Sequence, residues 1–127
     1  MNETQRRLVA AAAEGQLIAY NARDIDAFCN WYTDDVRVFD LVSGEVKLDG
    51  IAALRSAYGK QFAERPSKHA EVVSRQLLGD VAIDTELVTD DGAQAVRIAA
   101  IYLVETGDDA RAGHRGKIRR VWFTPAF

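Results

Sequence analysis

The chain has 127 residues, a length typical of one domain, and a single domain is expected over residues 1–127. Hydrophobic residues make up 48% of the chain and charged residues 28%, values that exclude disordered and fibrous proteins. The net charge of −3 argues against nucleic acid as a partner, and the lack of a long apolar segment argues against a membrane. The N-terminal residues have no apolar signal core, and the single cysteine, Cys29, cannot form an internal disulfide. A cytoplasmic location is therefore expected.

Two helices are predicted near the N-terminus. Asn2 or Thr4 can cap the first helix, and one face of it then carries Val9, Ala13, Gln16 and Tyr20. Asp24 can cap a short second helix, in which helical spacing is repeated by Ile25, Phe28, Cys29 and Tyr32. A turn at residues 33–35 (TDD) is expected to end this helix.

The next segment alternates between apolar and polar residues and predicts a strand over residues 36–40. Val36, Val38 and Asp40 share one face of it, so an acid ends an apolar row. A short strand at residues 46–48 follows. A third helix then begins after Asp49-Gly50 and ends at Arg65-Pro66, with an apolar face of Ile51, Leu54, Tyr58 and Phe62.

From Lys68 onward the pattern repeats every two residues, which predicts strands. Gly79-Asp80 can form a tight hairpin turn, and its register places Arg75 opposite Asp84. Two more strands are expected at residues 95–104 and 117–124, on either side of a polar loop. Helices followed by hairpin strands indicate an α+β fold, in which the N-terminal helices cover one face of a curved antiparallel sheet.

Four segments carry a resemblance to a known family, namely residues 19–28 (AYNARDIDAF), 31–40 (WYTDDVRVFD), 50–58 (GIAALRSAY) and 83–86 (IDTE). Together with the order of elements, they resemble the nuclear transport factor 2-like superfamily. This resemblance implies a cystatin-like fold, in which a curved antiparallel sheet wraps around the N-terminal helices to form a cone-shaped pocket. Within this superfamily, the chain is similar to SnoaL-like and ketosteroid-isomerase-like proteins. The superfamily contains isomerases, cyclases, hydrolases and noncatalytic domains, so the resemblance predicts the fold more closely than the reaction.

The resemblance implies roles for particular residues. Asp40 falls where ketosteroid isomerases keep their general base, and Tyr32 and Tyr58 fall where they keep pocket tyrosines. Gln16 and Ala100 stand where those enzymes have the tyrosine and the protonated aspartic acid of their oxyanion hole. The ligand-binding residues predicted from the expected pocket are Gln16, Tyr20, Tyr32, Tyr58, Phe62, Ile98, Ala100, Val121 and Phe123.

Several of these residues have alternative interpretations. Tyr20, Tyr32 and Tyr58 either line the pocket or are core aromatics whose hydroxyl groups find local acceptors. Asp40 either faces the pocket as a base that is mostly ionised at pH 7, or caps the turn at Leu41-Val42. Gln16 is either an interior amide with its own partners or a hydrogen-bond donor to a ligand.

The faces of the sheet follow from alternation along each strand. The pocket side is expected to carry Val72, Ile83, Thr85 and Leu87, together with Val96, Ile98, Ala100 and Tyr102. The outer face is expected to carry Arg75, Asp84, Glu86, Arg97, Ile101, Leu103 and Trp122. This mixture of apolar and charged side chains predicts a homodimer interface, the alternative being an exposed sheet with surface ion pairs.

Two functions are compatible with this sequence. In the first, Asp40 acts as general base in an isomerase, lyase or cyclase that moves a proton next to the carbonyl of an apolar ligand. In the second, the domain binds a ligand or dimerises without catalysis, and a position of Asp40 away from any cavity would favour it. No cofactor and no metal are expected, since His69 lacks companion ligands, His114 is expected in solvent, and Cys29 fits an apolar helix face.

Overall fold

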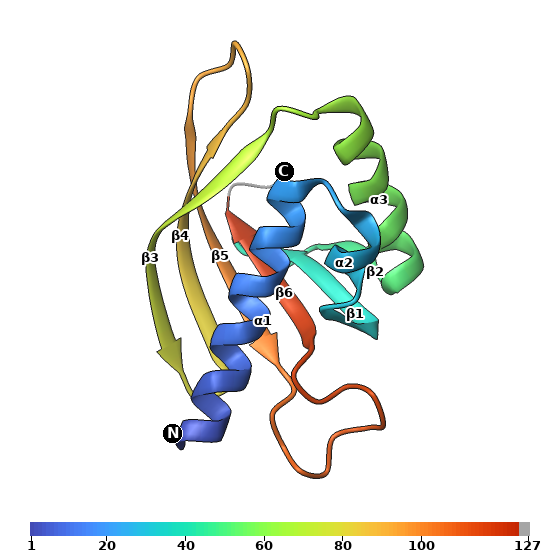
Figure 1. Cartoon of the computed structure of the whole chain (residues 1–127), viewed down its shortest axis with the longest axis vertical. Helices are drawn as coiled ribbons and strands as arrows, with labels where there is room; N and C mark the ends of the chain where they lie inside the picture. The colour runs from blue at the N-terminus through green and yellow to red at the C-terminus, as the bar shows by residue number, and fades with distance from the viewer. Residues whose placement is uncertain (125–127) are drawn as a thin grey trace.

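The fold consists of three helices and one six-stranded sheet (Figure 1), in a computed structural model that describes residues 1–124. The helices are α1 (Glu3–Ala22), α2 (Ile25–Cys29) and α3 (Ile51–Glu64). The strands are β1 (Tyr32–Asp40), β2 (Val46–Asp49), β3 (His69–Leu78), β4 (Val81–Thr89), β5 (Val96–Val104) and β6 (Ile118–Thr124). Their order across the open sheet is β2-β1-β6-β5-β4-β3, and the predicted α+β class is confirmed.

The helix ends use the predicted caps. Asn2 Oδ1 accepts a hydrogen bond of 2.7 Å from the Gln5 backbone N–H, and Asp24 Oδ1 accepts one of 3.1 Å from that of Ala27. Arg23 has a left-handed backbone (φ 57°) that ends α1 and turns the chain into α2.

The second helix is shorter than the sequence indicated, and the first strand is longer. α2 ends at Cys29, Tyr32 already belongs to β1, and the turn expected over residues 33–35 lies inside that strand. Its turn-forming residues still disturb the pairing, because Tyr32 opposes Ile118 while Arg37 opposes Arg120. The Thr33 hydroxyl donates to Asp35 Oδ1 within this irregular stretch, so local side-chain bonding bends the strand without ending it.

One strand pair departs from the antiparallel prediction. β1 and β6 run parallel, while the other four neighbouring pairs in the sheet are antiparallel. Hairpins force antiparallel pairing between consecutive strands, but β1 and β6 are far apart in the chain and no hairpin constrains them. The sheet is therefore mixed.

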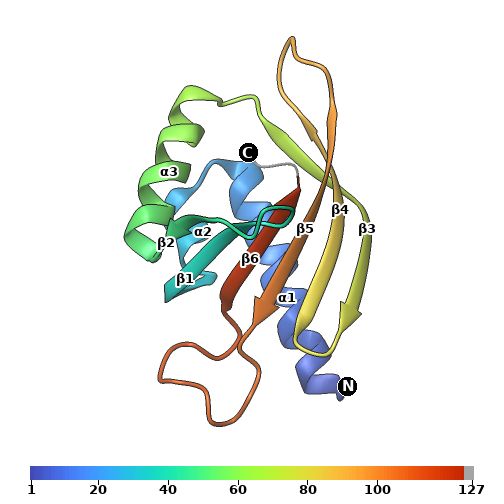
Figure 2. The ribbon, with the colours of Figure 1, turned by 180° about the vertical axis from the view of Figure 1, so that it is seen from behind.

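All three helices lie on one side of the sheet. α1 packs across β3, β4 and β5, whereas α3 packs against β1 and β2 (Figure 1). The opposite view shows the other side of the sheet with no helix in front of it (Figure 2). Among the described residues, no helix is both long and apolar enough to cross a membrane.

The side chains of β4 face the opposite way from the prediction. Ala82, Asp84 and Glu86 are buried toward the helices, and Ile83, Thr85 and Leu87 face outward and are only partly buried. On β3, Arg75 lies opposite Asp84 as predicted and also points inward. The prediction placed the apolar members of the alternation inside, but the outer face is itself apolar, so polarity did not distinguish the two faces.

Candidate functional site

A cavity of about 430 Å³ lies between the helices and the inner face of the sheet. Its volume lies within the range of small-molecule sites in proteins. The buried or partly buried residues of its wall are Gln16, Leu17, Tyr20, Phe28, Tyr58, Gln61, Ala70, Glu86, Val88, Ile98, Tyr102 and Phe123. Its outer rim is formed by the segment that joins α3 to β3 and by the loop between β4 and β5, with Arg65, Lys68, Thr89, Asp90, Ala93, Gln94 and Val96.

Aromatic rings from the three helices, those of Tyr20, Phe28 and Tyr58, form one wall of the cavity, and Phe62 packs against Tyr20 without lining the cavity. The ring centroids of Phe28 and Tyr58 are 4.7 Å apart, and those of Tyr20 and Phe62 are 5.6 Å apart in an edge-to-face arrangement. The sequence places these rings together because each belongs to the apolar face of its helix. Rings packed in this way form a rigid apolar wall suited to a flat, ring-sized ligand.

A carboxylic acid lies at the inner end of the cavity, on the middle of β4. Glu86 is only 4% exposed, and its Oε2 accepts a hydrogen bond of 3.0 Å from the Tyr102 hydroxyl on β5. Burial raises the pKa of Glu86 to about 7, against the opposing effect of the Tyr102 hydrogen bond. Glu86 is therefore divided between its acidic and basic forms at neutral pH, which suits a group that both takes up and returns a proton.

The tyrosines around Glu86 stay protonated at neutral pH. Burial raises the pKa of Tyr20, Tyr58 and Tyr102 above the ordinary value of 10.0. Their hydroxyl groups can donate hydrogen bonds throughout the range in which Glu86 changes charge. This cluster therefore combines a titrating acid with neutral hydrogen-bond donors.

Gln16 is an interior amide with partners within the protein. Its Oε1 accepts a hydrogen bond of 3.1 Å from the Tyr32 hydroxyl, and its Nε2 donates one of 3.0 Å to the Ala13 carbonyl. Gln16 also lines the cavity, so its second amide hydrogen is the part left for a ligand. The sequence analysis left both interpretations open, and the structure combines them.

A second acid of β4 has a cationic partner. Asp84 is fully buried, and Arg75 binds both of its carboxylate oxygens, with distances of 2.8 and 2.9 Å. Arg75 also donates to Glu14 of α1 at 3.0 Å. This network ties α1 to β3 and β4, and a bidentate pair of this kind satisfies the charge of Asp84.

Asp40 occupies a different place from the one expected. Its Oδ1 accepts hydrogen bonds of 2.9 and 3.0 Å from the backbone N–H groups of Val42 and Ser43, and the residue is not part of the cavity wall. The bond from Ser43 lowers the pKa of Asp40 most, so the side chain is ionised at pH 7 as expected. The strand parity was correct, but the carboxylate turns back to cap the following turn, the alternative interpretation of this residue. The inner end of the cavity holds Glu86 instead.

The other predicted ligand-binding residues divide into two groups. Tyr20, Tyr58, Ile98 and Phe123 line the cavity. Four more are buried in the core next to it without forming its wall, namely Tyr32, Phe62, Ala100 and Val121. Contact of any of them with a ligand stays a prediction.

The sequence of this fold matches a known family. The profile of the SnoaL-like domain matches residues 13–112, which is most of the chain. The chain belongs to the SnoaL-like family. The superfamily resemblance inferred from the sequence is thereby confirmed, and a search of curated proteins gave no match.

Several solved structures share the fold of this SnoaL-like domain. An uncharacterized cystatin-fold protein from Novosphingobium aromaticivorans is 29% identical, with a TM-score of 0.76 over 91% of this chain and 96% of that one. A candidate polyketide cyclase from Sinorhizobium meliloti is 19% identical, with a TM-score of 0.70 over 89% and 93%. A candidate ketosteroid isomerase from Kribbella flavida is also 19% identical, with a TM-score of 0.69 over 99% and 84%. At these identities the last two support the fold alone.

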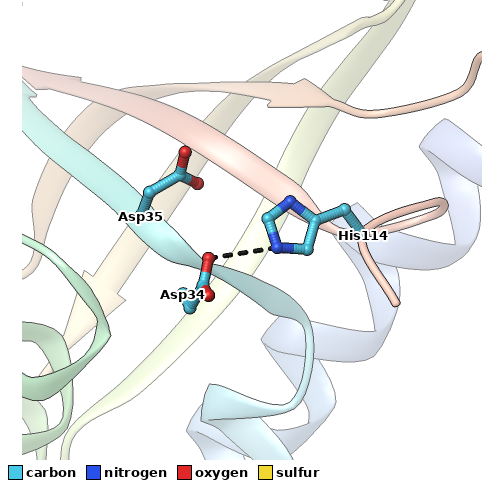
Figure 3. A group of neighbouring side chains, drawn as sticks. All are labelled: Asp34, Asp35 and His114. Carbon is cyan, nitrogen blue, oxygen red and sulfur yellow. Dashed lines mark ion pairs between the residues drawn. The ribbon is translucent and has the colours of Figure 1, made fainter. Parts of the chain in front are cut away.

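A third group of titratable side chains lies at the other end of this SnoaL-like domain. Asp34 and Asp35 of β1 and His114 of the loop before β6 come close together, and His114 Nε2 is 3.0 Å from Asp34 Oδ1 (Figure 3). His114 is buried, in contrast to the solvated position expected for it. Arg111 approaches both carboxylates, at 3.8 Å from Asp34 and 3.3 Å from Asp35. A hydrogen bond from the Thr33 hydroxyl is the largest cause of a lowered pKa at Asp35. Arg111 thus already pairs with both acids, and the group anchors the loop to β1.

Sequence reasoning missed Glu86 as a site residue, although a signal for it was present. Tyr102 was expected on the pocket side, and β4 and β5 pair so that Asp84 opposes Ala100 and Glu86 opposes Ile98. Paired residues of neighbouring strands share a face. Since Ala100 and Ile98 of β5 were expected to face the pocket, their partners Asp84 and Glu86 should face it as well.

Proposed function

We propose that this SnoaL-like domain is a small-molecule enzyme that moves a proton next to the carbonyl group of an apolar ligand, with Glu86 as the base. The observation that carries the proposal is a carboxyl group with a pKa of about 7 at the inner end of an aromatic cavity. Candidate cyclase and isomerase assignments among proteins of the same fold are compatible with this chemistry.

The proposed step needs one base and at least one donor to oxygen. Ionised Glu86 removes a proton from the carbon next to the carbonyl, and the electron pair of that C–H bond moves onto the carbonyl oxygen. The second amide hydrogen of Gln16, which lines the same cavity, is donated to this oxygen as negative charge develops. The protonated Glu86 then returns the proton to carbon, at the same or a different position, so the base is regenerated.

The second candidate is a domain that binds an apolar ligand without transforming it. The position of Asp40 favours it, because the residue at the place of the family's general base is bonded to its own turn. Noncatalytic binding uses the same cavity and needs no change in the charge of Glu86. A proton-exchange measurement separates the two candidates.

The test uses 2-tetralone, a ring-sized ketone with acidic C–H bonds, in deuterated buffer. Proton NMR follows the replacement of hydrogen by deuterium next to the carbonyl. We expect the protein to accelerate this exchange over buffer alone and Glu86→Gln to lower the acceleration by at least about a hundredfold. Glu71→Gln, at an exposed position of β3, is the matched control and should leave the exchange rate unchanged.

Three outcomes would count against the proposal. Loss of exchange in Asp40→Asn with full exchange in Glu86→Gln would show that Asp40, and not Glu86, is the base. Binding of 2-tetralone without accelerated exchange would support the noncatalytic domain. No binding at millimolar 2-tetralone would contradict a ring-sized ketone as ligand.

We further propose that the domain forms a homodimer through the uncovered face of the sheet. Strand pairing there aligns a row of apolar side chains across four strands, made of Phe39, Trp122, Ile101 and Ile83. The rings of Phe39 and Trp122 stack with centroids 5.5 Å apart. Such a row is typical of an interface core. Arg75, Asp84 and Glu86, expected on this face, lie on the other side, so the proposed interface is more apolar than predicted.

Light scattering at micromolar concentration tests this proposal. We expect twice the chain mass of 14.0 kDa for the protein and 14.0 kDa for Ile101→Glu, which places a charge in the apolar row. Ser56→Glu, at an exposed position of α3 on the opposite side of the sheet, should remain dimeric. A mass of 14.0 kDa for the unaltered protein would exclude the dimer.

A further inference from the structure

The outer end of the cavity carries positive charge from two sides. Arg65 lies at the end of α3, Lys68 lies just before β3, and both belong to the cavity rim. Arg23, at the end of α1, donates to the Arg65 carbonyl at 2.7 Å and so lies beside them. Three cations thus gather at one end of a largely apolar cavity.

One acid faces these three cations. Asp90, at the end of β4, is 3.6 Å from Arg65 and is its ion-pair partner. Lys68 forms no ion pair with any carboxylate of residues 1–124, although it is only partly exposed. Burial lowers the pKa of Lys68, the attraction of Asp90 opposes this change, and repulsion from Arg23 and Arg65 adds to it. An anion placed at Lys68 would offset this repulsion.

The two ends of the cavity therefore differ in charge. The inner end holds the buried carboxyl group of Glu86, whose ionised form repels an anion. The outer end has an excess of cations and attracts one. A ligand with a single negative charge is thereby oriented, with its charged group at the rim and its uncharged end toward Glu86.

We propose that the ligand of this cavity is an amphipathic carboxylic acid. Its apolar ring body lies against the aromatic wall of the cavity, and its carboxylate is bound by Lys68 beside Arg65. This inference rests on the proposed function, since it names the class of ligand for the same cavity. The carbonyl group that reacts then lies at the uncharged end of the ligand, within reach of Glu86 and the tyrosines.

The experiment compares two probes of similar shape and different charge, 2-naphthoate and 2-acetylnaphthalene. Calorimetric titration measures the Kd of each probe for the protein, for Lys68→Gln and for Lys60→Gln. Lys60 is the matched control, because it is exposed on α3 and pairs with Glu64, one turn along the helix. We expect the protein to bind 2-naphthoate about fivefold more tightly than 2-acetylnaphthalene, the scale of one partly exposed ion pair.

The variants should change one probe and leave the other unaffected. Lys68→Gln should remove the preference for 2-naphthoate and keep the Kd of 2-acetylnaphthalene, and Lys60→Gln should change neither. Tighter binding of 2-acetylnaphthalene by the protein, or equal effects of the two lysine variants, would overturn the assignment of a carboxylate while leaving the cavity as a ligand site. Binding of neither probe would overturn both the assignment and the proposed function of the cavity.

Discussion

Asp84 and Glu86 lie two residues apart on the same inward face of β4, and their surroundings differ in one respect. Asp84 is bound through both oxygens by Arg75, which also reaches Glu14. Glu86 has the hydroxyl of Tyr102 and an open cavity in front of it. One acid is thus held as a charge in an ion pair, while the other is held where burial opposes its charge.

This difference indicates that two acids of a single strand have different roles. An ion pair that closes around a buried acid stabilises one protonation state and links α1 to the sheet. An acid without a cation keeps both protonation states within reach at neutral pH and opens onto the cavity. The first arrangement supports the structure, and the second is suited to chemistry.

The largest effect is expected from removing the cation beside Asp84. Arg75→Met leaves a buried carboxylate without a partner, which should lower the free energy of unfolding at pH 7 by about 3–5 kcal/mol. Urea denaturation followed by circular dichroism measures this loss. Arg75→Met combined with Asp84→Leu should recover most of it, and a double variant as unstable as the single one would show that the ion pair is not the cause.

A smaller effect of opposite sign is expected at Glu86. Its pKa is raised from 4.5 to about 7 in the folded protein, so folding favours the protonated form and loses stability as pH rises between these values. The ionised acid therefore costs roughly 3 kcal/mol above neutral pH. Glu86→Gln should raise the free energy of unfolding at pH 8 by up to this amount and leave it nearly unchanged at pH 4.

The control for this measurement is Glu71→Gln, which removes an exposed carboxylate from β3. It should leave the dependence of stability on pH as it is in the unaltered protein. A Glu86→Gln protein whose stability still falls between pH 4.5 and 7 would contradict the raised pKa assigned to Glu86.

The smallest effect is expected from Tyr102→Phe. The Tyr102 hydroxyl donates to Glu86 and lowers its pKa, so its removal should raise that pKa further, by about one pH unit for a single hydrogen bond. Titration of the Glu86 carboxyl carbon by NMR gives the value directly. Tyr32→Phe, which removes the bond to Gln16, is the control, and an equal change there would make the effect nonspecific.

Much of the fold could be predicted from short-range signals. The caps Asn2 and Asp24 and the Gly79-Asp80 hairpin act over a few residues, and the hairpin also fixed the pairing of Arg75 with Asp84. These features depend on local backbone chemistry, so a single sequence contains the information for them. The parallel pairing of β1 with β6 depends on the whole chain and has no local signal.

The candidate site was harder to predict than the fold. The prediction placed Asp40 on the correct face of its strand. Two backbone N–H groups of the following turn bind its carboxylate, however, and sequence alone does not decide whether the carboxylate binds this turn or faces a pocket. On β4, one set of alternating side chains packs toward the helices and the other lies on the apolar outer face. The polarity of the sequence therefore does not show which set is inside. A β-bulge between Val72 and Ser74 shifts the parity of β3, so Val72 lies on the same inward face as Glu86, as predicted, although Ile83, Thr85 and Leu87 face outward.

The position of β6 has a consequence for the order in which this sheet can assemble. β6 lies between β1 and β5, so the pair β2-β1 and the group β5-β4-β3 are joined edge to edge only through the last strand. During synthesis from the N-terminus, β1 leaves the ribosome long before β6 has been made. The edge of β1 that pairs with β6 therefore has no partner strand while the hairpins of β3, β4 and β5 form. Closing such a distant contact is slow because its entropic cost precedes the gain from pairing. The complete cavity wall, which includes Phe123 of β6, is therefore among the last parts of the protein to form.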